Sequence, residues 1–411
     1  MENYITEIEI VSSRNVRNLN IPLSSEKRQH LILTGKNGSG KTSLLLELNK
    51  YLTKIDSGES KDYGKNLNQL ETYKKQLSNT SLNEKQKHDL KNNIKNYENW
   101  ILGFGGTKIK FSNTDEIIST RCKSGEFLLA FFDSKRHTNL TVPQGITKVQ
   151  LKKKYQLQEK ANPSFIQYIV NLKADRSFAR DDNEMDTVSK IDEWFDKFEN
   201  RLKTLFDDND LKLKFDRKAY NFNIESGQGE PFNFNTLSDG YSAIISIVSE
   251  LLLRMEAHNR KSYDLEGVVI IDEIETHLHV ELQKIVLPFL IDFFPKLQFI
   301  VTTHSPFILS SISNATICDL ESKIVTKDLT NYSYDALIES YFRTDKYSEE
   351  VKTKVFEFET LTEKSELNES EKEALKELRN YFAHSPKYLS DELIVKLQEI
   401  ELKEITKKKK K

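Results

Sequence analysis

The sequence predicts an α/β fold with a mixed, largely parallel sheet and helical additions. The apolar run at residues 31–33 leads into a glycine-rich loop and then into an apolar, helix-like stretch that ends near residue 48. Two further apolar runs, at 267–271 and 297–303, each end in polar residues, as buried parallel strands do. The segments between and after these runs carry apolar residues every three or four positions, which predicts helices.

The composition is that of a globular chain. Its 411 residues, 37% hydrophobic and 30% charged, suffice for two or three folding units of roughly 100 to 200 residues each. A net charge of −2 gives no overall basic field, so contact with nucleic acid is possible only through a local patch such as Lys407–Lys411. The simpler interpretation of that lysine run is a solvated tail.

Cysteine usage and hydropathy indicate a cytoplasmic protein. The two cysteines, Cys122 and Cys318, lack the spacing of metal ligands and fit a reducing compartment. The N-terminal residues lack the pattern of a signal peptide, and no apolar run reaches the roughly 18 residues of a membrane helix. We therefore expect no membrane span.

The glycine-rich loop predicts a nucleotide site. Between a predicted strand and a predicted helix it reads G-x-x-x-x-G-K-[ST], in which glycines let backbone N–H groups point at phosphate oxygens. We expect Lys41 to reach the β and γ phosphates of ATP and the Thr42 hydroxyl to bind Mg²⁺. An ordinary glycine-rich turn is the alternative. The residues expected to bind the nucleotide here are Gly35, Lys36, Asn37, Gly38, Ser39, Gly40, Lys41, Thr42 and Ser43.

Three later positions complete this chemistry. Ser238 and Gly240 begin an apolar, helix-like stretch, where a serine and a glycine can form a second anion site or an ordinary helix cap. Asp272 and Glu273 follow a predicted strand; we expect Asp272 to hold Mg²⁺ or its water, and Glu273 to orient or deprotonate the attacking water. His304 follows the next strand and is expected to touch the γ-phosphate.

Together these residues resemble the ABC ATPase family, with Walker A at 35–42, a signature at 237–241, Walker B at 268–273 and a switch histidine at His304. The resemblance implies catalytic roles for Lys41, Glu273 and His304. It also implies a head-to-tail dimer, or a higher homo-oligomer, in which each signature covers the nucleotide on the partner's Walker A.

A closer resemblance rests on two strings, Asp-Glu-Ile-Glu-Thr-His-Leu-His at 272–279 and Thr-Thr-His-Ser-Pro at 302–306. Both are similar to the ATPase heads of bacterial anti-phage systems, such as Septu, retron-associated and PARIS ATPases and the overcoming-lysogenization-defect nucleases. This implies a sensing or regulatory ATPase that works with a separately encoded effector, expected to be a nuclease. An alternative is a DNA-repair ATPase of the RecF or SMC type.

Some positions depart from the family pattern or stay open. The signature has Asp239 where transporters carry glycine, and the Q-loop glutamine has only Gln144 and Gln150 as candidates, by position. His277 and His279 form an H-x-H without an evident third metal ligand, in the place of the family's intersubunit D-loop.

The chain is predicted to divide into five parts. Between the two head segments lies an insertion in which apolar residues repeat helically over 66–101, which predicts an antiparallel hairpin that either projects or lies on the head. Ser81 and Glu84 predict a capping box for its second helix. The predicted parts are a first head segment at 1–57, the insertion at 58–209, a second head segment at 210–325, a helical region at 326–405 and a lysine-rich tail at 406–411.

The helical C-terminal region holds one further string, Arg379 to His384, that resembles the HEPN ribonuclease motif Arg-Asn-x-x-x-His. An arginine and a histidine in this arrangement could clamp a phosphate and act as acid and base in attack by a 2′-hydroxyl. The alternative function is thus an ATP-gated ribonuclease that uses Arg379 and His384. An ordinary amphipathic helix end explains the same residues.

Overall fold

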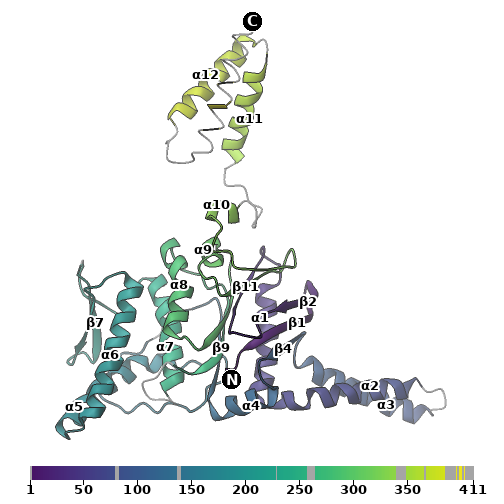
Figure 1. Cartoon of the computed structure of the whole chain (residues 1–411), viewed down its shortest axis with the longest axis vertical. Coiled ribbons are helices and arrows are strands. Elements are labelled where there is room, and N and C mark those ends of the chain that lie inside the picture. The colour runs from purple at the N-terminus through teal and green to yellow at the C-terminus, as the bar shows by residue number, and fades with distance from the viewer. Residues whose placement is uncertain are drawn as a thin grey trace. The chain divides into compact units, whose positions relative to one another are not determined.

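The computed structural model describes residues 2–78, 83–136, 140–227, 229–256, 264–338, 349–364 and 367–384, with isolated positions at 395, 398, 399 and 402. The chain divides into two compact units, Met1–Tyr334 and Asp335–Lys411 (Figure 1). The first unit carries every residue of the expected nucleotide site.

A six-stranded sheet forms the centre of the first unit. Its strand order is β12-β11-β3-β10-β9-β5, and all neighbours pair in parallel except β12, which is antiparallel to β11. The apolar runs of the sequence form its buried middle strands, and the two predicted head segments meet where β3 pairs with both β10 and β11. The strands are β3 (His30–Thr34), β5 (Phe127–Phe132), β9 (Glu266–Ile271), β10 (Leu297–Thr302), β11 (Ala315–Asp319) and β12 (Ile324–Lys327).

A second, antiparallel sheet covers one side of this core. It has the order β2-β1-β4, and its apolar residues share one buried cluster with helix α1 and with strands of the central sheet. Helix α1 follows β3 directly and buries one leucine-rich face, which fixes the loop between them. These elements are β1 (Ile5–Ser13), β2 (Val16–Pro22), β4 (Thr107–Phe111), α1 (Lys41–Ser57) and α4 (Asp115–Ser124).

Helices and a small sheet form the rest of the first unit. Apolar residues that recur every three or four positions over 191–205 are buried along one face of α6, and two antiparallel strands, β6 and β7, precede the signature. Helix α7 is buried along nearly its whole length and packs against α5, α8 and β5. The elements are α5 (Phe165–Asp181), α6 (Met185–Phe206), α7 (Asp239–Glu256), α8 (Val280–Phe293), α9 (Pro306–Leu309), β6 (Lys212–Asp216), β7 (Asn221–Glu225) and β8 (Phe232–Asn233).

The predicted helical hairpin is formed by α2 (Tyr63–Leu77) and α3 (Glu84–Leu102). It projects from the first unit (Figure 1), since α3 has no buried residue and α2 has only Leu70. The predicted capping box at Ser81 and Glu84 is wrong. Asn83 caps α3 and exchanges hydrogen bonds with Gln86, and Ser81 lies outside the described residues. Asparagine is as good a cap as serine, and it stands directly before the first helical residue.

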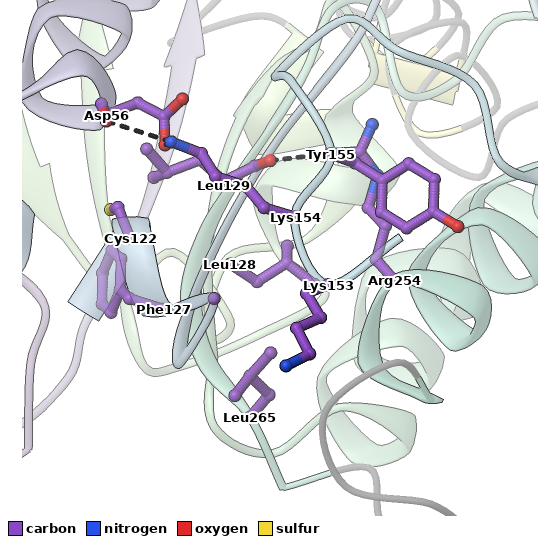
Figure 2. A pocket seen from close by; sticks show the side chains of 11 residues that line it. Asp56, Cys122, Phe127, Leu128, Leu129, Lys153, Lys154, Tyr155, Arg254 and Leu265 are labelled. Carbon is purple, nitrogen blue, oxygen red and sulfur yellow. Dashed lines mark hydrogen bonds and ion pairs between the residues drawn. The ribbon is translucent and has the colours of Figure 1, made fainter. Parts of the chain in front are cut away.

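The segment after β5 returns along the open edge of that strand. Phe131 donates its backbone N–H to the carbonyl of Leu157 at 3.0 Å, and Arg254 donates to the carbonyl of Leu129 at 2.9 Å. Figure 2 shows part of this segment, Lys153 to Tyr155, from close by, with the ammonium of Lys154 paired to the carboxylate of Asp56 at 2.7 Å. The otherwise free edge of the central sheet is thereby covered.

The second unit contains a helix pair, α11 (Glu349–Glu363) and α12 (Glu369–His384), around a core of its own. The helical character predicted for this region is confirmed for these residues, whereas the lysine-rich tail lies outside the described part. The predicted boundaries at 57, 209 and 325 remain predictions. The core residues are Phe358, Leu361, Leu375 and Leu378.

Gln298 in β10 connects the central sheet to the antiparallel sheet by side-chain hydrogen bonds, and a substitution there tests this connection. Its fully buried side chain accepts the N–H of Ile5 at 2.7 Å and donates to the carbonyls of Ile5, at 2.9 Å, and Gln29, at 2.7 Å. Gln298→Met keeps the size but leaves these backbone groups unpaired, so we expect a loss of about 2–4 kcal/mol in the free energy of unfolding. Urea denaturation measures it. The exposed Gln76→Met is the matched control, and equal stability of both variants would contradict the assigned role.

Candidate nucleotide-binding site

The loop between β3 and α1 has a backbone that requires glycine. The φ angles of Gly35, Gly38 and Gly40 are 130°, 83° and 102°, a region that other residues rarely adopt. A Cβ atom on Gly35 would also lie 2.9 Å from the hydroxyl oxygen of Ser39. The sequence therefore folds here into a turn whose N–H groups lie at the N-terminus of α1, where an anion is favoured.

Lys41 lies across this loop. It is 6% exposed, and its ammonium donates to the carbonyls of Gly35 at 2.7 Å and Lys36 at 3.1 Å. Burial lowers the pKa of Lys41, while the carboxylates of Glu273 and Glu275 oppose that shift. A buried cation held between the loop and the acidic residues after β9 is suited to bind phosphate oxygens.

The residues expected to bind Mg²⁺ come together from two elements. The Thr42 hydroxyl, in the first turn of α1, donates to Oδ2 of Asp272 at 2.9 Å. On the other side, the Thr302 hydroxyl at the end of β10 donates to Oδ1 of the same carboxylate at 2.6 Å. One hydroxyl oxygen and one carboxylate beside a phosphate loop fit a hard divalent cation such as Mg²⁺.

Glu273 follows in an unusual backbone conformation. Its φ of +46° lies in the left-handed region, and its N–H donates to the Thr302 hydroxyl at 2.7 Å. Thr276 donates to its carboxylate at 3.4 Å. A residue with a side chain adopts this conformation only where the surrounding hydrogen bonds hold it there.

His304 is half-buried at the end of β10, beside the same carboxylates. Burial and the nearby charge of Lys41 lower the pKa of His304, and Glu273 and Asp272 oppose this less strongly. The imidazole is therefore neutral near pH 7, so it can donate from one ring nitrogen and accept on the other.

The structure brings three further residues to the site that sequence reasoning missed. Asn15, in the turn between β1 and β2, donates to the carbonyl of Gly38 at 3.2 Å. Glu275 accepts the backbone N–H of His304 at 2.6 Å, and Arg136 donates to the backbone after β9. Glu275 stands in the Asp-Glu-Ile-Glu string, where it could have been noticed. Asn15 and Arg136 carry no sequence signal.

The signature residues lie at the start of α7. Ser238 is exposed and its carbonyl accepts the N–H of Ser242 at 2.9 Å, which forms the first helical turn. Gly240 is buried, and a Cβ there would lie 3.0 Å from the carbonyl oxygen of His277 and from Leu282. Close packing against the segment after Walker B therefore explains this glycine, and its phosphate contact remains a prediction.

The two candidates for the Q-loop glutamine, Gln144 and Gln150, are both exposed. The two histidines of the H-x-H, His277 and His279, are exposed as well. His279 is the N-cap residue of α8, and its ring lies 6.4 Å from that of Tyr241. In the described part of the chain, no histidine, cysteine or carboxylate joins the H-x-H in a group of three suited to a metal.

Arg379 and His384 both belong to α12. The side chain of His384 lies outside the described residues. The ribonuclease role of this pair remains a hypothesis.

The fold and the site resemble those of an ABC-type P-loop ATPase head. The chain is similar in sequence to a Septu protein and to probable ATPases of retrons. Septu protein PtuA of Bacillus mycoides (strain KBAB4) is 27% identical over 78% of this chain and 40% of its own length. The Retron Ec83 probable ATPase of Escherichia coli is 38% identical over 20% of this chain and 16% of its own length.

Two further similarities concern a family model and a solved structure. The family described as "AAA domain, putative AbiEii toxin, Type IV TA system" matches residues 143–310. A crystal structure of an Smc head bound to the C-winged helix domain of ScpA has a TM-score of 0.40 and 12% identity, over 79% of this chain and 96% of its own. The chain spans two fifths or less of the length of the Septu and retron relatives named above.

None of the described helices combines the length and the apolar character that crossing a bilayer requires.

Glu275 is predicted to lower the stability of the nucleotide-free protein. Burial raises the pKa of this carboxyl, and its Oε2 makes no hydrogen bond among the described residues. A folded state that holds the proton more tightly than the unfolded chain loses stability as the pH rises above the ordinary pKa of 4.5. We therefore expect Glu275→Gln to be more stable than the wild type, by a margin that is larger at pH 8 than at pH 5.

Urea denaturation at the two pH values measures this margin. Glu281→Gln, at an exposed position of α8, is the matched control. A margin that shrinks between pH 5 and pH 8 would show that the ionised Glu275 stabilises the fold.

Proposed function

We propose that two copies of this chain meet head to tail and hydrolyse ATP, with Mg²⁺, at two composite sites. The observation that carries the proposal is the hydrogen bond between Thr42 and Asp272, with the buried ammonium of Lys41 beside them. A cation, a hydroxyl and a carboxylate at one loop are what a magnesium nucleotide requires.

Each residue has a role in this proposal. Lys41 and the backbone of 35–40 bind the phosphates, and Thr42 and Asp272 would hold Mg²⁺, which supplies positive charge to the transferred phosphoryl group. Glu273 orients and deprotonates the attacking water, and neutral His304 donates a hydrogen bond toward the γ-phosphate.

The second half of each site comes from the partner in this proposal. Ser238 is exposed at the start of α7, where helix N–H groups favour an anion. Asp239 is exposed as well, whereas α7 is buried from Ala243 to its end. This supports a site that is completed by the phosphates held on another copy.

The relatives support a role in anti-phage defence, as a sensing or regulatory ATPase with a separately encoded effector nuclease in the cytoplasm. Septu and retron proteins carry the similar sequences, and the effector is inferred by analogy with such systems. An HNH or Toprim nuclease gene beside this one would support the proposal. ATP-dependent binding of duplex DNA without a toxic partner would favour a DNA-repair role instead.

The role of Glu273 is tested by a change that keeps its shape. Glu273→Gln removes the base but leaves Lys41, Thr42 and Asp272 in place, so we expect ATP binding to persist and turnover to fall about 100-fold or more. Phosphate release and equilibrium binding of ATP measure the two effects. Lys41→Ala is the binding-deficient reference. Normal turnover by Glu273→Gln would remove this residue from the proposed role.

The composite site is tested by mixing two inactive variants. Ser238→Arg fills the signature anion site but leaves its own Walker A intact, whereas Lys41→Ala has the opposite defect. A heterodimer holds one doubly damaged site and one intact site, so we expect each variant alone to be nearly inactive and the mixture to regain part of the wild-type rate. Phosphate release measures the rate, and differently tagged copies establish that heterodimers form. Normal hydrolysis by Ser238→Arg alone would rule out the composite site.

A further inference from the structure

Arg136 occupies a position between the end of β5 and the end of β9. It is 6% exposed, and its two terminal nitrogens donate to the carbonyl of Asp272 at 2.8 Å and the carbonyl of Glu273 at 2.6 Å. The backbone N–H of Asp272 in turn donates to the carbonyl of Phe132 at 2.9 Å, which brings the two strand ends together. One guanidinium thus bonds to both peptide groups of the Walker B acids.

One of the two bonds from Arg136 goes to the carbonyl of Glu273, the residue with the left-handed backbone conformation. Glu273 has a φ of +46°, which is unfavourable for a residue with a side chain and persists only where neighbours enforce it. Hydrogen bonds from a charged donor are stronger than neutral ones, and the planar fork of arginine fits two adjacent carbonyls. Arg136 therefore holds this turn together with Thr302, which accepts the N–H of Glu273, and Thr276, which donates its N–H to the carbonyl of Glu273.

We propose that Arg136 is a positioning residue of the ATPase site. It fixes the peptide groups of Asp272 and Glu273, so that the Glu273 carboxylate stays directed toward the phosphate loop while ATP is bound. The inference rests on the proposed function, because it assigns the support of the catalytic base rather than a new reaction.

A neighbouring cavity makes the inference testable. A cavity of about 310 Å³ is lined by Arg136 together with other residues, among them Asn162, Glu250 and Arg254. Since one water molecule takes about 30 Å³ in the liquid, the cavity holds enough space for water to replace a shortened side chain. We therefore expect substitutions at this position to leave the fold intact.

Two variants separate charge from geometry. Arg136→Lys keeps the positive charge but loses the fork, and Arg136→Gln loses both. The matched control is Arg121→Gln, because Arg121 binds Glu266 at 2.7 Å at the opposite end of the same strand β9. Steady-state phosphate release gives kcat and KM, equilibrium binding gives the affinity for ATP, and thermal denaturation gives Tm.

We expect kcat to fall about tenfold or more in Arg136→Gln and by a smaller factor in Arg136→Lys. The affinity for ATP should stay within about twofold of the wild type, because Lys41 and the loop at 35–40 are untouched. Arg121→Gln should keep its kcat. A wild-type kcat in Arg136→Gln would overturn the inference while leaving the proposed function standing.

A parallel loss of kcat, ATP affinity and Tm in Arg136→Gln would also overturn the inference, since it would show a general structural role. Absence of hydrolysis by the wild-type protein would instead overturn the proposed function, and this inference with it.

Discussion

The parallel pairing of β3, β10 and β9 is the constraint on which the site depends. Leu33 is in register with Thr302, and Val301 with Ile271, so the three strands end at one edge of the sheet. The segments that follow them are far apart in the sequence, yet they meet within hydrogen-bond distance. Without this register Thr42 would not reach Asp272, and Lys41 would be buried without nearby carboxylates.

A buried network holds α7 to the same sheet. Glu250 accepts the backbone N–H groups of Ala161 and Asn162 at 2.7 and 2.8 Å, and it pairs with Arg254, which donates to the carbonyl of Leu129 in β5. The desolvation cost of burying an ion pair is offset only where further hydrogen bonds satisfy both groups, as they do for Glu250 and Arg254. The network orients α7 and with it the exposed Ser238.

The sequence alone was sufficient to predict those elements that have a strong hydrophobic periodicity or contain a motif. The strands around Leu31, Val269 and Ile300, the helix that buries Trp194 and the loop at 35–42 carry such signals. The β1 and β2 hairpin was missed, because its partly exposed strands lack a clean alternation of apolar and polar residues. Arg136 was missed for another reason: a lone arginine in a loop acquires meaning only when β5 pairs with β9. Position alone could not identify Gln144 or Gln150, since no local pattern marks that loop.

The projecting hairpin has a consequence for how such chains diverge. Its two helices contact each other through Tyr73 and Tyr97 and through the pair of Lys74 and Glu98, while Tyr63 and Trp100 at its base pack against the core of the head. Whole heptads added symmetrically to both arms would repeat these contacts farther out and leave every residue of the core and the nucleotide loop unchanged. The length of the hairpin can therefore differ between homologues without changing the nucleotide site. Such differences in length say little about the chemistry of these proteins.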